Sequence, residues 1–334
     1  MTGSKPRVAI ISTGGTIDAV GASRLDLASY TETRARLGEG ELVERVPELR
    51  DIAIIEERSF PRRPSYAIDA ADWLEMARVV NELVGRQDMD GVVITHGTNT
   101  LEETAYFLHL VVRPPKPVVL VGAMRPSSGL GADGYLNLFR AVQVAASPSS
   151  RGHGALVVMN DTIFAARDVT KTSTFRVQAF QAPDTGPVGY ADADGRVVFY
   201  HRHTRTVAEG PAFAVSDLDS LPRVDVILSH VGADGTFVDA AVEAGADGIV
   251  SAGTGAGRST PREDDAYDRA LARGVLVCQS SRVGSGRIAR APSMMHRGIV
   301  VADNLQPWKA RVLLQLALTR TTDLRAVQAI FDEL

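Results

Sequence analysis

Residues 91–112 read GVVITHGTNTLEETAYFLHLVV, and this stretch contains a complete strand–loop–helix unit. Gly91–Thr95 is almost continuously apolar and β-branched, which is typical of a strand buried on both faces of a parallel sheet. Thr100 and Glu103 have the spacing of a capping box, so the sequence predicts that a helix begins here and runs over Leu101–Val112. A buried strand followed by a helix is the repeating unit of an α/β fold.

Apolar runs alternate with amphipathic segments of helix length along the rest of the chain. Further strands are predicted at Arg7–Thr13, Pro117–Gly122, Ala155–Met159, Val224–His230, Gly248–Ala252, Gly274–Gln279 and Ile299–Ala302. Further helices are predicted at Ala70–Gly85, Tyr135–Ala146, Val238–Ala244, Glu263–Arg273, Pro307–Thr319 and Leu324–Leu334. The pattern predicts an α/β protein with mostly parallel sheets and flanking helices.

The chain is long enough for two domains, since it has 334 residues and a domain has roughly 150. The stretch His201–Pro222 has no sustained hydrophobic period and contains charges, a glycine and two prolines. We therefore predict an N-terminal catalytic domain over residues 1–205, a linker over about 201–222 and a C-terminal domain over 222–334.

Composition excludes several classes of protein and site. No apolar run is long enough to span a membrane, and a net charge of −4 does not favour nucleic acid. Cys278 is the single cysteine, and the seven histidines show no metal-binding pattern, so we expect no disulfide and no metal. The glycines of Gly253–Gly257 lack the following apolar helix of a dinucleotide site. Met1–Val8 has no apolar segment, which predicts a cytoplasmic protein, although a periplasmic form with a processed signal remains open.

The residues after the predicted strands are the candidate site, because ligands of open α/β sheets bind beyond the carboxyl ends of the strands. Thr16 follows Gly14-Gly15 after the first strand. Its hydroxyl suits a nucleophile beside backbone N–H groups that could stabilise an oxyanion. The alternative is an ordinary turn in which Thr16 only caps a neighbouring element.

Two more loops carry polar residues of interest. Thr98 and Asn99 precede a helix N-terminus, which favours an anion such as a carboxylate, unless they serve only as caps. Lys171 is one of four lysines in a chain with thirty-two arginines. Because a buried lysine can release its proton and an arginine cannot, Lys171 is a candidate for proton transfer. The alternative is an ordinary surface lysine.

Seven motifs together resemble the bacterial L-asparaginases and glutaminase-asparaginases over nearly the whole chain. They are STGGTI (12–17), THGTNTLEET (95–104), PVVLVGAMRP (117–126), VVMNDT (157–162), RDVTKT (167–172), GIVSAG (248–253) and KARVLLQLALT (309–319). The resemblance implies a two-domain α/β fold and a homotetramer of intimate dimers that share their active sites. It also implies hydrolysis of a small-molecule carboxamide to acid and ammonia through a covalent threonine intermediate, with no cofactor.

The resemblance also assigns roles to individual residues. Thr16 matches the nucleophile, Thr98 the second catalytic threonine and Lys171 its lysine partner. Tyr30 matches less securely a tyrosine on a mobile lid, here residues 20–34, and either Tyr30 or Thr98 with Lys171 would activate Thr16. Ser65 matches a serine that binds the substrate α-carboxylate. The remaining substrate-binding positions, including those whose backbone surrounds the oxyanion, are Gly15, Tyr66, Gly97, Asn99 and Ala256.

The sequence departs from the family where the substrate's α-ammonium group is bound. Asn99 stands where the family has an aspartate, Tyr66 where it has a glutamine, and Ala256 where it has an asparagine. The family also supplies a glutamate from the partner subunit, but the matching segment here, Arg287–Arg297, contains no Asp or Glu. A buried ammonium without a counter-charge costs about 3–5 kcal/mol. We therefore predict a carboxylated amide, or a related lactam or ester, that lacks the α-ammonium. The alternatives are an ordinary L-asparaginase and a non-catalytic ligand-binding protein.

Overall fold

The computed structural model describes residues 5–112, 116–202 and 211–334, and these form two compact units, Met1–Asp217 and Leu218–Leu334. Residues 203–210 of the predicted linker lie outside the described residues. Each unit has its own sheet and its own helices, so each is described separately below.

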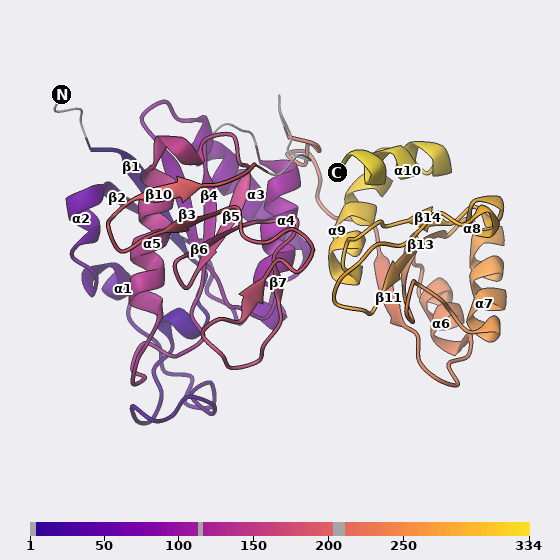
Figure 1. Cartoon of the computed structure of the whole chain (residues 1–334), viewed down its shortest axis with the longest axis horizontal. Helices are drawn as coiled ribbons and strands as arrows, with labels where there is room; N and C mark the ends of the chain where they lie inside the picture. The colour runs from indigo at the N-terminus through magenta and orange to yellow at the C-terminus, as the bar shows by residue number, and fades with distance from the viewer. Residues whose placement is uncertain (1–4, 113–115, 203–210) are drawn as a thin grey trace. The chain divides into compact units, whose positions relative to one another are not determined.

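The N-terminal unit is built on an eight-stranded sheet with the order β10-β9-β6-β5-β4-β3-β1-β2 (Figure 1). The five strands from β5 to β2 are parallel, and β6, β9 and β10 continue the sheet in antiparallel fashion. The strands are β1 (Arg7–Ser12), β2 (Ile54–Ser59), β3 (Gly91–Thr95), β4 (Val118–Val121), β5 (Ala155–Met159), β6 (Thr162–Ala165), β9 (Gly189–Ala191) and β10 (Val197–Phe199).

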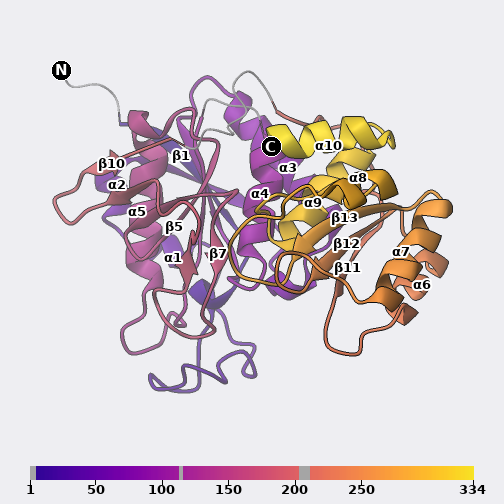
Figure 2. The ribbon, with the colours of Figure 1, turned by 45° about the vertical axis from the view of Figure 1, so that its right-hand side comes forward.

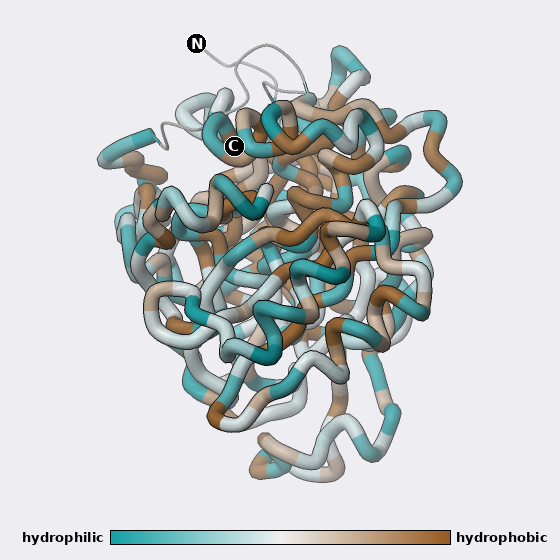
Figure 3. Tube along the Cα trace, turned by 90° about the vertical axis from the view of Figure 1, so that its right-hand side faces the viewer, coloured by the Kyte–Doolittle hydropathy of each residue, from teal (hydrophilic) through white to brown (hydrophobic). Residues whose placement is uncertain are grey.

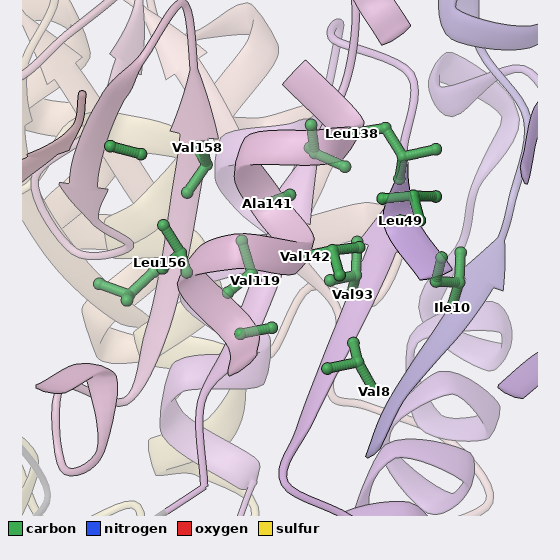
Figure 4. Close-up of a cluster of buried hydrophobic side chains, with 14 of the residues drawn as sticks. Val8, Ile10, Leu49, Val93, Val119, Leu138, Ala141, Val142, Leu156 and Val158 are labelled. Carbon is green, nitrogen blue, oxygen red and sulfur yellow. The ribbon is translucent and has the colours of Figure 1, made fainter. Parts of the chain in front are cut away.

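Helices cover both faces of this sheet. The helix α5 packs on β3, β4 and β5, and α3 and α4 pack together and contact the same strands. Figure 4 shows Val93 of β3 and Val119 of β4, which are paired across the sheet, on the side of the sheet covered by α5, with Val142 of α5 beside Val93. The helices of this unit are α1 (Glu41–Glu44), α2 (Leu49–Ile52), α3 (Ala70–Gly85), α4 (Leu101–Val111) and α5 (Gly134–Ala146), with short 3₁₀ turns η1 (Thr16–Asp18), η2 (Ser65–Ala67) and η3 (Pro148–Ser150).

The C-terminal unit has a four-stranded parallel sheet whose strands follow chain order, β11 (Val224–Leu228), β12 (Gly248–Gly253), β13 (Leu276–Ser281) and β14 (Val300–Val301) (Figure 2). One face packs on α6 and α7 through a buried cluster that includes Ile249, Val277 and Tyr267. Figure 3 shows hydrophobic residues gathered on interior segments and hydrophilic residues on outer turns. The helices are α6 (Thr236–Glu243), α7 (Pro261–Ala272), α8 (Pro292–Arg297), α9 (Pro307–Leu318) and α10 (Leu324–Glu333).

The α/β fold class predicted from the sequence is confirmed, and the ends of the predicted elements differ from the observed ends by at most two residues. The edge strand β2 and the short strands β6 to β10 were not predicted. Of these, β7 (Thr170–Lys171) and β8 (Phe180–Gln181) form a separate antiparallel pair. Among the described residues, no helix is both long enough and apolar enough to cross a membrane.

His96, directly after β3, is fully buried and held in one tautomer. Because the Gly97 carbonyl can only accept, His96 Nδ1 carries the ring proton and donates to it at 2.8 Å. His96 Nε2 then accepts from the Thr104 hydroxyl, 3.0 Å away, and the Trp73 indole N–H donates to the same hydroxyl at 2.9 Å. Burial lowers the pKa of His96 to about 4, so the ring is neutral at neutral pH.

Because this pKa is lower in the folded chain than in the unfolded chain, His96 favours the folded state above pH 6.5, and that contribution is lost as the pH falls towards 4. At pH 5 the loss for this one group is about 2 kcal/mol. We expect His96→Gln to lose correspondingly less stability than the wild type between pH 8 and pH 5, measured by urea unfolding. His230→Gln, at an exposed histidine, is the control and should follow the wild type. Equal losses in wild type and His96→Gln would contradict the assignment.

Candidate active site

Three backbone segments meet at the carboxyl edge of the N-terminal sheet. Parallel pairing of β1 with β3 aligns Ser12 with Thr95, so the loops that follow leave the sheet side by side. A Cβ atom on Gly15 would lie 2.6 Å from the Gly97 Cα, and one on Gly97 would lie 2.6 Å from the Ser65 Oγ. Gly15 also has a φ of 108°, in the region that favours glycine. Only glycine therefore fits at both positions.

A cavity of about 690 Å³ is lined by Gly15, Gly97 and Ser65, together with the residues around them. It falls in the size range of small-molecule sites. Nine of the ten residues predicted for the site line the cavity, namely Gly15, Thr16, Tyr30, Ser65, Tyr66, Gly97, Thr98, Asn99 and Lys171. The tenth, Ala256, belongs to the C-terminal unit, where it is exposed in a turn bridged by Thr254 and Arg258, and its part in the site stays a prediction.

Thr16 and Tyr30 form the first polar pair in the cavity. The Thr16 Oγ1 and the Tyr30 hydroxyl lie 2.8 Å apart, at hydrogen-bond distance. Thr16 begins the short turn η1 directly after Gly15. Tyr30 reaches it from the segment 20–34, whose base is closed by the isolated bridge between Ala19 and Arg36.

Thr98 and Lys171 form the second polar pair. The Lys171 Nζ donates to the Thr98 Oγ1 at 2.8 Å, from the strand β7. Burial lowers the pKa of Lys171, and the negative charge of Glu102 raises it to a smaller extent. Lys171 is half-buried at the cavity wall rather than a freely solvated surface lysine.

The capping box predicted at Thr100 is wrong, although α4 does begin at Leu101 as predicted. The Thr100 hydroxyl donates to the Ser65 carbonyl at 2.8 Å, and the Glu103 N–H donates to the Thr100 carbonyl rather than to its side chain. The hydroxyl therefore joins two of the loops of the site instead of capping the helix. Ser65 itself is buried beneath Gly97.

Arginines and an aromatic ring were missed by the sequence analysis. Arg34, Arg36, Arg62 and Phe175 also line the cavity. Asp18, nearly buried behind them, accepts a hydrogen bond from Arg36 at 2.9 Å and lies 3.8 Å from an Arg62 nitrogen. Burial raises the pKa of Asp18, and the two guanidinium groups oppose this rise. The arginines are distant from Thr98 and Lys171 in sequence, so no local spacing indicated them.

No Asp or Glu is among the described residues that line the cavity, and its charged lining is therefore cationic. No cluster of His, Cys, Asp and Glu that could hold a metal occurs in residues 5–112, 116–202 and 211–334. The expectation that the protein uses no metal and no cofactor stays a prediction. The arrangement places two hydroxyls, those of Thr16 and Thr98, beside cationic side chains. Each hydroxyl is paired with a second side chain that carries a proton.

Comparison with known proteins identifies relatives over the whole chain. Residues 7–205 match the family model "Asparaginase, N-terminal", and residues 223–331 match "Glutaminase/Asparaginase C-terminal domain". The chain is 43% identical to L-asparaginase 2 of Bacillus subtilis, with 98% of this chain and 86% of the relative covered. It is 39% identical to the glutaminase-asparaginase of Pseudomonas fluorescens biotype A, with 98% and 90% covered. The crystal structure of a probable cytoplasmic L-asparaginase from Campylobacter jejuni matches with a TM-score of 0.93 at 40% identity, covering 98% of this chain and 99% of that one.

The stacked glycines lead to a prediction about geometry. Gly15→Ala must push the Gly97 backbone away, and a displacement of about 1 Å in a catalytic site can lower the rate on the order of a hundredfold. We expect the variant to fold, as judged by circular dichroism, and to lose most of its amide hydrolysis, as judged by ammonia release. Gly85→Ala is the matched control, because a Cβ there meets nothing within 4 Å. Full activity of Gly15→Ala would show that the spacing of these loops is not critical.

Proposed function

The chain belongs to the asparaginase family and is an amidohydrolase of that family, and we propose that it hydrolyses the side-chain amide of L-asparagine to L-aspartate and ammonia. The two hydrogen bonds at the wall of one cavity, Thr16 with Tyr30 and Thr98 with Lys171, support catalysis by this chain. The similarity to proteins named L-asparaginase supports L-asparagine as its substrate. A non-catalytic ligand-binding protein would not require these two pairs.

In the proposed reaction, the Thr16 Oγ1 attacks the carbon of the carboxamide. A threonine hydroxyl is a weak nucleophile until a base takes its proton, and Tyr30 is the side chain at hydrogen-bond distance from it. The proton taken from Thr16 goes to the amide nitrogen, so the tetrahedral intermediate expels ammonia and leaves an ester on Thr16. Water then cleaves this ester, which releases the acid and restores the Thr16 hydroxyl. Backbone N–H groups around Gly15 and Thr98 would stabilise the oxyanion.

Lys171 serves as the proton-transfer partner of Thr98 in this proposal. Burial lowers the pKa of Lys171, so its neutral amine is more populated at neutral pH than that of an exposed lysine. A neutral amine can accept a proton that an arginine at the same place could not. As the alternative base to Tyr30, Lys171 would take the Thr16 proton through the Thr98 hydroxyl, whose Oγ1 lies 2.8 Å from the Nζ.

A second candidate substrate is an amide that keeps the carboxylate and lacks the α-ammonium group. The observation in its favour is the charged lining of the cavity, which contains Arg34, Arg36, Arg62 and Lys171 and no acid among the described residues. Hydrolysis of L-asparagine therefore requires groups outside this lining to bind the ammonium. The predicted cytoplasmic location and homotetramer stay predictions, as does a contribution of a partner subunit to the site.

The nucleophile is tested by two substitutions at one position. Thr16→Val keeps the shape of the side chain and removes the hydroxyl, so we expect it to abolish ammonia release, whereas Thr16→Ser should keep measurable activity. Mass spectrometry of wild type quenched during turnover should find the acyl group on the peptide that contains Thr16. Activity of Thr16→Val near the wild-type level, or an acyl group on Thr98, would move the nucleophile to Thr98.

The substrate is tested by comparing L-asparagine with succinamate, which has the same amide and carboxylate and no ammonium. The proposal predicts a higher kcat/KM for L-asparagine. If the ammonium has no counter-charge anywhere, about 3 kcal/mol is lost, and succinamate should be favoured roughly a hundredfold. A higher kcat/KM for succinamate would favour the second candidate substrate. The measured preference therefore decides between the two candidates.

A further inference from the structure

A buried carboxylate lies directly behind Lys171. Glu102 is in the first turn of α4 and is 6% exposed, and its Oε1 accepts the backbone N–H of Lys171 at 3.2 Å. It follows Thr98 by four residues, so one short segment supplies both the hydroxyl that the lysine contacts and this carboxylate. Asn99, which lies nearer to Thr98 in sequence, carries no charge.

Glu102 is also the group whose charge acts on the amine. Its negative charge opposes the lowering of the Lys171 pKa that burial causes. The residues paired in the hairpin that carries Lys171, namely Thr170, Phe180 and Gln181, are uncharged, and Arg176 lies in the loop that joins the two strands. The other titratable or charged side chains at the cavity are Tyr30, Arg34, Arg36, Arg62 and Tyr66.

We propose that Glu102 is the positioning residue for Lys171: it anchors the lysine main chain so that the amine reaches Thr98, and it places a negative charge behind the amine. Glu102 touches neither substrate nor reacting atoms in this scheme and acts through Lys171. The inference rests on the proton-transfer role of Lys171 in the proposed function.

The two parts of this role can be separated by substitution. Glu102→Gln keeps an oxygen that can accept the Lys171 N–H and removes the charge, so it tests the electrostatic part. Glu102→Asp keeps the charge but shortens the side chain by one methylene. It therefore weakens both the hydrogen bond to the Lys171 backbone N–H and the electrostatic effect on the Lys171 amine. Glu103→Gln, in the same helical turn, is the matched control for loss of one negative charge.

The scarcity of lysine allows a direct measurement. In protein labelled with ¹³C at the lysine ε-carbon, the four lysines give four NMR signals, and Lys171→Arg identifies the one from Lys171. We expect the Lys171 pKa to be lower in Glu102→Gln than in the wild type, because the negative charge of Glu102 raises it. Glu103→Gln should leave it unchanged.

The pH dependence of kcat/KM should shift in the same direction as the Lys171 pKa. If the neutral amine is the active form, the acidic limb of the kcat/KM profile moves to lower pH in Glu102→Gln and stays in place in Glu103→Gln. An unchanged Lys171 titration in folded Glu102→Gln overturns the inference. If Glu102→Gln does not fold, Glu102→Asp decides: a smaller fall in the Lys171 pKa with a lower kcat supports the inference, and no change in either overturns it.

A failure of the proposed function would give a different experimental result from a failure of this inference. Lys171→Arg with wild-type activity would remove the proton-transfer role of the lysine. The NMR titration of Lys171 in Glu102→Gln does not depend on turnover, so it would still report whether Glu102 sets the protonation of the amine.

Discussion

The close approach of backbones at the carboxyl edge of the N-terminal sheet is the constraint on which the candidate site depends. Gly15 lies against Gly97, and Gly97 lies against Ser65, with no room for a Cβ atom at either glycine. Gly122, after β4, lies equally close to the His96 carbonyl. The parallel register of β1, β3 and β4 brings these loops together, and the absence of side chains lets Thr16 and Thr98 reach the same cavity.

The sequence predicted the long apolar strands and the amphipathic helices, and missed the strands that are short or carry several charges. Gly91–Thr95 and Ala70–Gly85 were predicted with their observed ends because continuous burial and a long amphipathic period leave clear patterns. The strand β2, Ile54–Ser59, contains two glutamates and an arginine and pairs only with β1, so its alternation is weak. The strands β6 to β10 are two to four residues long, too short to show a period.

The threonine–glutamate spacing of a capping box had two different outcomes in this chain. Thr260 and Glu263 form a true capping box at the start of α7, with both hydrogen bonds present. Thr100 and Glu103 have identical spacing, but the Thr100 hydroxyl bonds to Ser65, thirty-five residues away in sequence. Spacing thus predicted where each helix begins, and tertiary contacts decided which hydrogen bond each threonine makes. The arginines of the cavity escaped prediction for the same reason, because folding alone brings them beside Thr16.

The charges around the cavity follow one arrangement, in which cations line the wall and carboxylates lie behind it. Asp18 is buried behind Arg36 and Arg62, and Glu102 is buried behind Lys171. Each carboxylate offsets part of the cost of burying its cation without presenting negative charge to the ligand. In the proposed function, the cationic lining attracts the carboxylate of the substrate, and the negative charge of Glu102 acts on the proposed proton-transfer group, Lys171. Under that proposal, binding of the anionic part of the substrate and proton transfer at Thr98 would depend on two separate buried acids, Asp18 and Glu102, which can be altered one at a time.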